Sequence, residues 1–337
     1  MTMCTFVCAA VCDFVTPTAP DAAQKYLPQD VTSFGDDLWY VVKQAVQHIS
    51  PDLAKAAAIC CSLIAIAILI SIVENLSDTA QHISHVTGVI AASAVLLNAT
   101  GTLIALGSET VEQISEYGKL LLPVLTSALA AQGGGGSAVL LYSGSIIFNT
   151  ILTTVLSKIL IPCIYVYIAI CIANRAVGNK ALSDLAKLIK NTTTWVLKTS
   201  LYIFTGYMTI TGVVSGSVDA ASVKAAKLAI SGSVPVVGGI LSDASEAFLA
   251  GVRIAKNAVG ITGLITILAI WIGPFLKVGV QYVLLKFTGA VCSAFHAKGI
   301  SELVEDFSGA MGLLLAATGA IGFIHLLSTV CFIRGVA

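Results

Sequence analysis

The chain has 337 residues, of which 57% are hydrophobic and only 11% are charged. Soluble domains carry about 25% charged residues, so this composition indicates a membrane protein with several spans. Basic and acidic residues balance at 18 each, and no basic patch points to a nucleic-acid partner. The nine cysteines form no CxxC pair and no Cys/His cluster at zinc spacing, so we expect no metal site and no full disulfide framework.

The first region, residues 1–53, has a short apolar start and continues as a polar, amphipathic stretch. The apolar start, residues 4–15, is similar to the core of a signal peptide but has no positive charge before it. The second region, residues 54–107, predicts two membrane spans at 54–73 and 83–106. The orientation of the N-terminus stays open at this point.

The third region, residues 108–214, begins with an acidic amphipathic segment that leads into a first broken stretch, KLLLPVLTSALAAQGGGG (119–136). In this stretch a short apolar run is interrupted by proline and ends in four glycines. The 38 residues 137–174 are apolar except for one lysine, and they predict two closely spaced spans. Residues 195–214 predict one more span.

The fourth region, residues 215–337, contains a second broken stretch, SGSVPVVGGILSDASE (231–246). A helix needs about 20 apolar residues to cross a bilayer, so this stretch is too short to span. Irregular backbone at membrane depth must lie inside protein or beside water, which predicts a re-entrant segment or a buried loop. Further spans are expected at 258–276, 279–297 and 310–333. The fold class is therefore an all-α transmembrane bundle of about eight spans, with seven as the alternative count.

The third and fourth regions repeat the same order of elements and differ in the charge of their connections. Residues 175–198 hold five basic residues and one acidic residue, a net charge of +4. Residues 298–309 hold one basic and three acidic residues, a net charge of −2. Basic connections favour the cytoplasmic side, so opposite signs predict an inverted repeat with two re-entrant segments. Chance recurrence of helix hairpins is the alternative.

Candidate pathway residues come from the two broken stretches and from polar positions in the spans beside them, because transporters bind substrate at such paired breaks. A charged side chain within a span is costly, which makes Lys286 a candidate, although a lysine can also extend to the membrane interface. Asn149 and Asn257 either line a pathway or join helices. The full set is Pro123, Gly133, Gly134, Asn149, Pro235, Gly238, Gly239, Asn257 and Lys286.

Two acidic residues, Asp243 and Glu246, follow the second broken stretch, where they are expected to cap the next helix and interact with its positive end. His325 lies in the last predicted span, and we expect a satisfied buried histidine rather than a proton relay. The chain has no HExxH motif and no Walker A motif, so we predict neither enzyme activity nor a cofactor.

Both broken stretches resemble a known family. Residues 231–246, followed by IAKNAVGITGL (254–264), and LLPVLTSALAAQGGGGSA (121–138) are similar to the stage III sporulation protein AE family, over roughly residues 110–333. The resemblance implies a multi-pass protein of the mother-cell membrane around the forespore, acting as the permease or export-apparatus part of a secretion-like channel complex. Membrane lipid, other subunits of that complex and a second copy of the chain are the implied partners. The alternative is a scaffold that seats ring-forming partners without transporting.

Overall fold

The computed structural model describes residues 17–28, 34–76, 81–131, 135–210 and 258–336. The regular elements in these residues are all helical, which confirms the predicted all-α class. In chain order they are α2 (Asp21–Gln24), α3 (Phe34–His48), α4 (Ser50–Leu76), α5 (Gln81–Ala131), α6 (Gly135–Val155), the π-helical turn η2 (Leu156–Leu160), α7 (Ile161–Val177), α8 (Lys180–Ile210), α11 (Ala258–Ala294) and α12 (Lys298–Val336).

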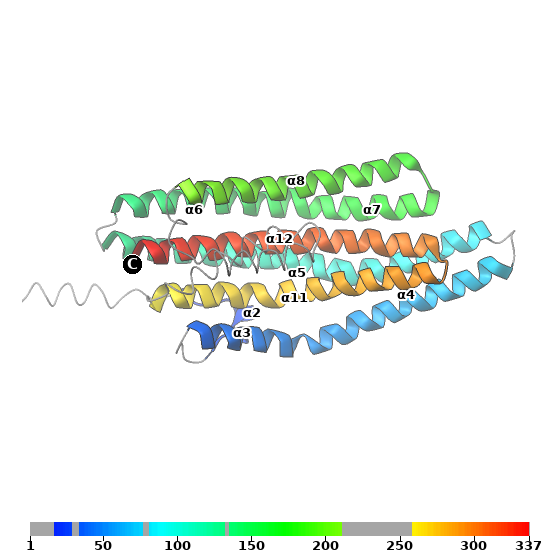
Figure 1. Cartoon of the computed structure of the whole chain (residues 1–337), viewed down its shortest axis with the longest axis horizontal. Helices are drawn as coiled ribbons and strands as arrows, with labels where there is room; N and C mark the ends of the chain where they lie inside the picture. The colour runs from blue at the N-terminus through cyan, green and yellow to red at the C-terminus, as the bar shows by residue number, and fades with distance from the viewer. Residues whose placement is uncertain (1–16, 29–33, 77–80, 132–134, 211–257, 337) are drawn as a thin grey trace, which may run out of the picture.

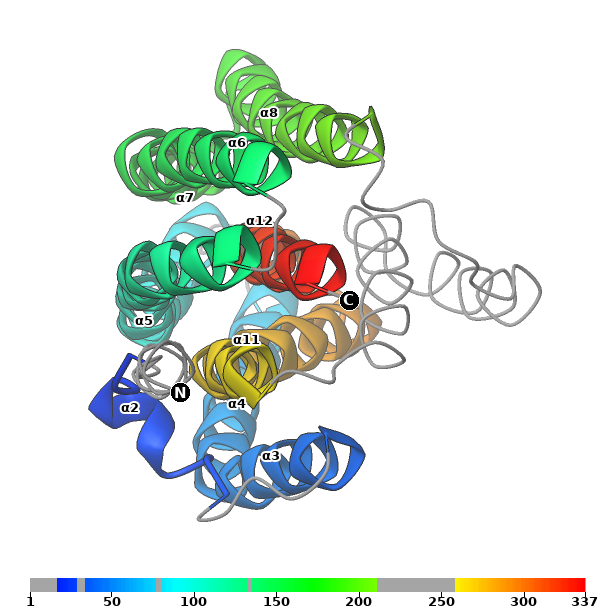
Figure 2. The same ribbon diagram turned by 90° about the vertical axis from the view of Figure 1, so that its left-hand side faces the viewer.

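The long helices lie side by side in an elongated bundle with α12 at its centre (Figures 1 and 2). Helix α12 packs against α5, α6, α7, α8 and α11. It is also the most enclosed candidate span, because 94% of its most apolar 18-residue segment is buried. At about 1.5 Å per residue its 39 residues extend about 58 Å, so a single helix forms the core along most of the bundle.

Glycines set the register of α12 against its neighbours. In the α11–α12 hairpin, Gly322 lies against Trp271, whose indole Nε1 donates a hydrogen bond of 2.9 Å to the carbonyl oxygen of Thr318. Against α5, Gly107 lies beside Leu314 and Gly118 beside His325, so α5 and α12 run parallel. Small residues at such contacts let two helices approach closely in a membrane.

Five helices in the described residues are long and apolar enough to cross a membrane, which is fewer than the eight spans predicted. Residues 137–174 were expected to form two spans, but they lie in one nearly continuous helix, α6–η2–α7. Its Pro162 directly follows the π-helical turn η2, a local change of hydrogen-bond pattern that lets the helix continue through the proline. The spans expected at 258–276 and 279–297 are likewise one helix, α11, with Pro274 inside it. Apolar helices tolerate such prolines because neighbouring groups satisfy the backbone carbonyls that a proline leaves without a donor. The chain therefore does not reverse at either proline.

Helix α8 is not among the five candidate spans, although residues 195–214 were predicted to cross. Its charged and hydroxyl side chains, including Lys187, Lys190 and Lys198, lower its hydropathy. The last four residues of that predicted span lie outside the described residues.

The first broken stretch is not re-entrant in the part that the structure describes. Helix α5 continues through Pro123 as far as Ala131, and the predicted region boundary at residue 107 falls inside it. In the turn after the proline, the hydroxyls of Thr126 and Ser127 donate to the carbonyl oxygens of Leu122 and Val124 at 2.7 and 2.8 Å, so these two hydroxyls are satisfied within the helix. The second broken stretch lies outside the described residues.

The two helix hairpins, α6–α7 with α8 and α11 with α12, run in the same direction, so the predicted inverted repeat is wrong for them. Their turns, at residues 178–179 and 295–297, lie at the same end of the bundle (Figure 1). The charge argument fails for a physical reason. Arg175 of the basic connection pairs with Glu302 and Asp306 of the acidic one, so the opposite signs attract each other on one side of the molecule.

Candidate functional site

A two-residue turn between α7 and α8 places the best-defined charged cluster. Gly178 ends α7 in the left-handed conformation (φ 72°), and its N–H donates to the carbonyl oxygen of Asn174 at 2.7 Å. Asn179 follows, and its side-chain Oδ1 accepts a hydrogen bond of 2.9 Å from the N–H of Ala181. The chain therefore reverses at once, and the last turn of α7 is held against the first turns of α12.

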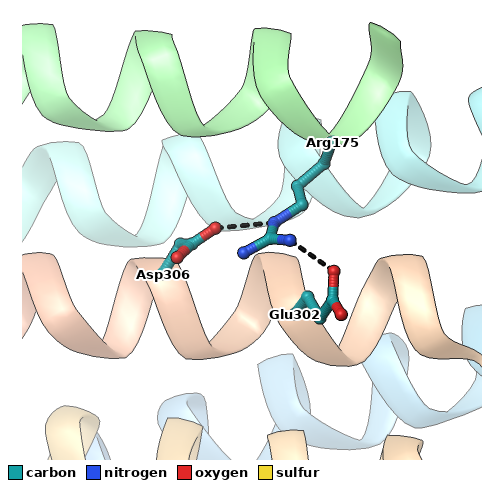
Figure 3. Close-up of polar contacts among 3 residues, drawn as sticks. All are labelled: Arg175, Glu302 and Asp306. Carbon is teal, nitrogen blue, oxygen red and sulfur yellow. Dashed lines mark hydrogen bonds and ion pairs between the residues drawn. The ribbon is translucent and has the colours of Figure 1, made fainter. Parts of the chain in front are cut away.

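Arg175 joins α7 to α12 through two carboxylates (Figure 3). Its Nε donates to Oδ2 of Asp306 at 2.8 Å, and its Nη1 donates to Oε2 of Glu302. Glu302 and Asp306 are four residues apart, so they share one face of α12. The three side chains are 20–37% exposed, which leaves them partly screened by water. Charge-assisted bonds from a planar guanidinium fix orientation as well as distance, so this cluster, which we call the Arg175 clamp, holds the two hairpins in register.

A cavity of about 340 Å³ adjoins the Arg175 clamp. It combines cationic and neutral donors with one carboxylate, a lining suited to a small polar group rather than an apolar one. The lining residues are His85, Asn174, Arg175, Gly178, Asn179, Lys180, Ser183, Gly299 and Glu302. No group of three His, Cys, Asp or Glu side chains that could hold a metal occurs in the described part of the chain.

A second ion pair lies near the middle of the bundle. Lys277 of α11 approaches Asp52 in the first turn of α4, with 2.9 Å between Nζ and Oδ2. A smaller cavity of about 150 Å³ lies beside this pair, and Lys55 and Gln281 contribute to its lining. The pair ties the start of α4 to the long central hairpin.

The three predicted pathway residues that the structure describes do not come together in one place. Asn149 is buried in α6, with 5% exposure, whereas Lys286 is exposed on the outer side of α11, near the α11–α12 turn. Pro123 is exposed on α5. The remaining predicted residues, Gly133, Gly134, Pro235, Gly238, Gly239, Asn257, Asp243 and Glu246, lie outside the described residues.

Sequence reasoning did not single out the Arg175 clamp. The sequence does contain the pattern, because Glu302 and Asp306 lie four residues apart near the start of α12 and Arg175 lies near the end of an apolar helix. In the prediction these charges contributed only to the net charge of the two connections. His325 is buried as expected, and its Nδ1 lies 3.0 Å from the carbonyl oxygen of Ile321, but its Nε2 has no hydrogen-bond partner among the described residues.

These features define an all-α integral membrane protein built from long, continuous helices. The family model described as Stage III sporulation protein AE (spore_III_AE) matches residues 28–335, and the chain belongs to that family. The match begins well before residue 110, where the resemblance was expected to start. The chain is also similar to stage III sporulation protein AE of Bacillus subtilis (strain 168), with 22% identity over 232 residues. This alignment covers 69% of the chain and 58% of the relative, so the chain spans less than two thirds of the relative's length. No solved structure matches the chain.

Proposed function

We propose that the chain is the membrane-embedded component of a channel or secretion-like complex between mother cell and forespore, and that it acts as the permease part. The observation that carries the proposal is the family match across residues 28–335. Five candidate spans in the described residues support a location in a membrane. We propose that this is the mother-cell membrane around the forespore. Other subunits of the complex and membrane lipid are the proposed partners, and we propose no enzymatic step.

The packing of α12 supports a permease more than a simple anchor. An anchor needs only apolar contacts inside the bundle, yet buried polar side chains such as Asn149 and His325 lie on helices that pack together. Polar groups inside a membrane bundle are costly and commonly mark pathways. We therefore place the proposed pathway along the inner side of α6 and α12.

Solute release from liposomes tests this proposal. Purified protein, with and without its co-purified subunits, is reconstituted around a small fluorescent solute. We expect release that the Asn149→Leu variant lowers at least tenfold, while Leu152→Met, a volume-conserving change on the same helix, leaves it unchanged. No release under either condition would count against the permease.

A scaffold is the second candidate function, and the outer side of α8 favours it. Leu188, Trp195 and Tyr202 are spaced by seven residues, so they form a stripe along one side of the helix, and they are 62%, 66% and 68% exposed. Exposed aromatic residues are typical of interfaces with partners or lipid. If the scaffold is correct, Trp195→Ala abolishes co-purification of partner subunits at normal membrane level. Tyr165→Ala, an exposed aromatic residue on α7, is the matched control.

A further inference from the structure

One side of α6 carries small polar side chains at intervals of four residues. They are Ser145, Asn149 and Thr153, followed by Ser157 in the η2 turn. Their side-chain polar atoms, including both amide atoms of Asn149, are buried and have no hydrogen-bond partner among the described residues. Ser145 is fully buried and Asn149 is 5% exposed. Residues four apart lie on one side of a helix, so these groups form a row.

The neighbouring helices add polar groups of the same kind. On α12, His325 Nε2 and Ser328 Oγ are buried and unpartnered among the described residues, and on α5 so is Ser115 Oγ. His325 is 2% exposed and Ser328 is fully buried. These groups come from two other helices, which makes them an observation independent of the row on α6.

Helix packing brings these groups to one level of the bundle. Helices α5, α6 and α12 all contact one another. His325 lies against Gly118 of α5, where an added Cβ would meet the ring at 2.4 Å. Helices α5 and α6 are antiparallel neighbours joined at residues 132–134, and Gly118 and Asn149 lie 15 and 16 residues from position 133. Asn149 is therefore level with Gly118, and so with His325, to within about one helical turn.

Buried polar atoms in proteins are almost always hydrogen-bonded, either to protein or to ordered water. A buried water typically makes about three hydrogen bonds to groups that would otherwise be unsatisfied. The groups collected here are hydroxyls, one carboxamide and one imidazole. The carboxylates of α5 near this level, Glu112 and Glu116, are exposed on the outer side. The set therefore suits a neutral hydrogen-bonding ligand better than a cation.

We propose that α5, α6 and α12 enclose a polar seam that binds a chain of water molecules. The polar seam consists of Ser115, Ser145, Asn149, Thr153, Ser157, His325 and Ser328. Its hydroxyls and the carboxamide of Asn149 can each both donate and accept hydrogen bonds, which lets bound waters link them in series. The seam does not depend on transport, because bound water satisfies these groups whether or not solute passes.

Hydroxyl-radical footprinting of the unmodified protein tests the polar seam without any substitution. Radicals form from water next to a side chain, so bound water exposes a buried residue to oxidation. We expect His325 to be oxidised at least tenfold faster than Phe332, which is fully buried on the same helix and intrinsically more reactive. Protection of His325 equal to that of Phe332 would overturn the proposal.

Thiol accessibility gives a second measurement on α6. Asn149→Cys and Leu152→Cys place cysteines at two buried positions of one helix, with 5% and 2% exposure in the parent side chains. A small charged methanethiosulfonate is applied in detergent, and peptide mass spectrometry separates the new sites from the native cysteines. We expect at least tenfold faster modification at residue 149. Equal rates would mean that water and reagent reach residue 149 no more readily than residue 152, and the proposal would fail even if liposomes release solute.

Discussion

At the scale of single residues, the Arg175 clamp is the main electrostatic link between the two hairpins. Its two charge-assisted bonds reach carboxylates one turn apart on α12, so removing the guanidinium leaves two acidic side chains facing each other. Because these side chains are partly buried, removing one partner should cost more stability than breaking an exposed ion pair and less than breaking one fully withdrawn from water.

We expect Arg175→Met to lower the free energy of unfolding by about 2 kcal/mol, a value between those of exposed and buried pairs. Thermal unfolding in detergent measures the change. Lys187→Met is the matched control, because Lys187 pairs with Asp184 at 3.8 Å with both side chains more than 60% exposed. Equal stability of the two variants would mean that the clamp does not hold the hairpins together.

Gly118 tests the packing of α5 on α12. A Cβ at this position would lie 2.4 Å from Cδ2 of His325, so Gly118→Ala must displace a buried ring and should destabilise the protein by about 1–3 kcal/mol. Gly101→Ala on the same helix meets nothing within 4 Å and should stabilise by up to about 1 kcal/mol through helix propensity. Changes of the same sign in both variants, measured by chemical unfolding, would contradict the α5–α12 register.

At the scale of helices, the sequence predicts well which residues form helices and predicts poorly in which direction each helix runs. Apolar runs near residues 54–73 and 83–106 lie in α4 and α5 as expected. Residues 137–174 and 258–297 were each expected to form two spans, but a π-helical turn and an apolar neighbourhood allow the helices to continue through Pro162 and Pro274. Direction depends on which charges meet in space, and net charge per connection does not contain that information.

The parallel hairpins predict that their turns face the same side of the membrane. Asn179→Cys and His296→Cys place a thiol in each turn. We expect a membrane-impermeant reagent to modify both from the same side of oriented vesicles, with permeabilised vesicles as the control. Modification from opposite sides would restore the inverted repeat.

At the scale of the whole molecule, the bundle is longer than a bilayer is thick. Helix α12 extends about 58 Å, and even at a tilt of about 40° it rises about 44 Å, against a hydrocarbon core of about 30 Å. Part of the bundle must therefore lie outside the hydrocarbon. On α5 the exposed residues Glu109, Glu112 and Glu116 mark a side that faces water or a polar partner rather than lipid, because each carboxylate facing hydrocarbon would cost about 2.5–3.5 kcal/mol.

We expect Glu112→Cys to react with a water-soluble maleimide in liposomes, because this side of α5 faces water or a polar partner. Leu97→Cys, exposed on the same helix within the apolar run, is the control and should stay unmodified. A rate at residue 112 as low as that at residue 97 would place the acidic side inside the bilayer.

The candidate site was predicted only in part. Asn149 was singled out because a polar residue inside an apolar run is visible in sequence, and the structure shows it buried in α6. The partners of Arg175 were not, because they are 127 and 131 residues away along the chain. His325 was expected to be satisfied, and the unpartnered Nε2 depends on three-dimensional packing against α5.

Spore formation by cells whose only copy is the Asn149→Leu variant tests the central claim most directly. Membrane level and co-purified subunits are measured in the same cells, and Leu152→Met is the control. If the polar interior is needed for function, the variant loses at least tenfold in heat-resistant spores while its membrane level and its co-purified subunits stay normal. Normal spore numbers, or a loss only where the complex falls apart, would contradict the claim and leave the chain as a scaffold.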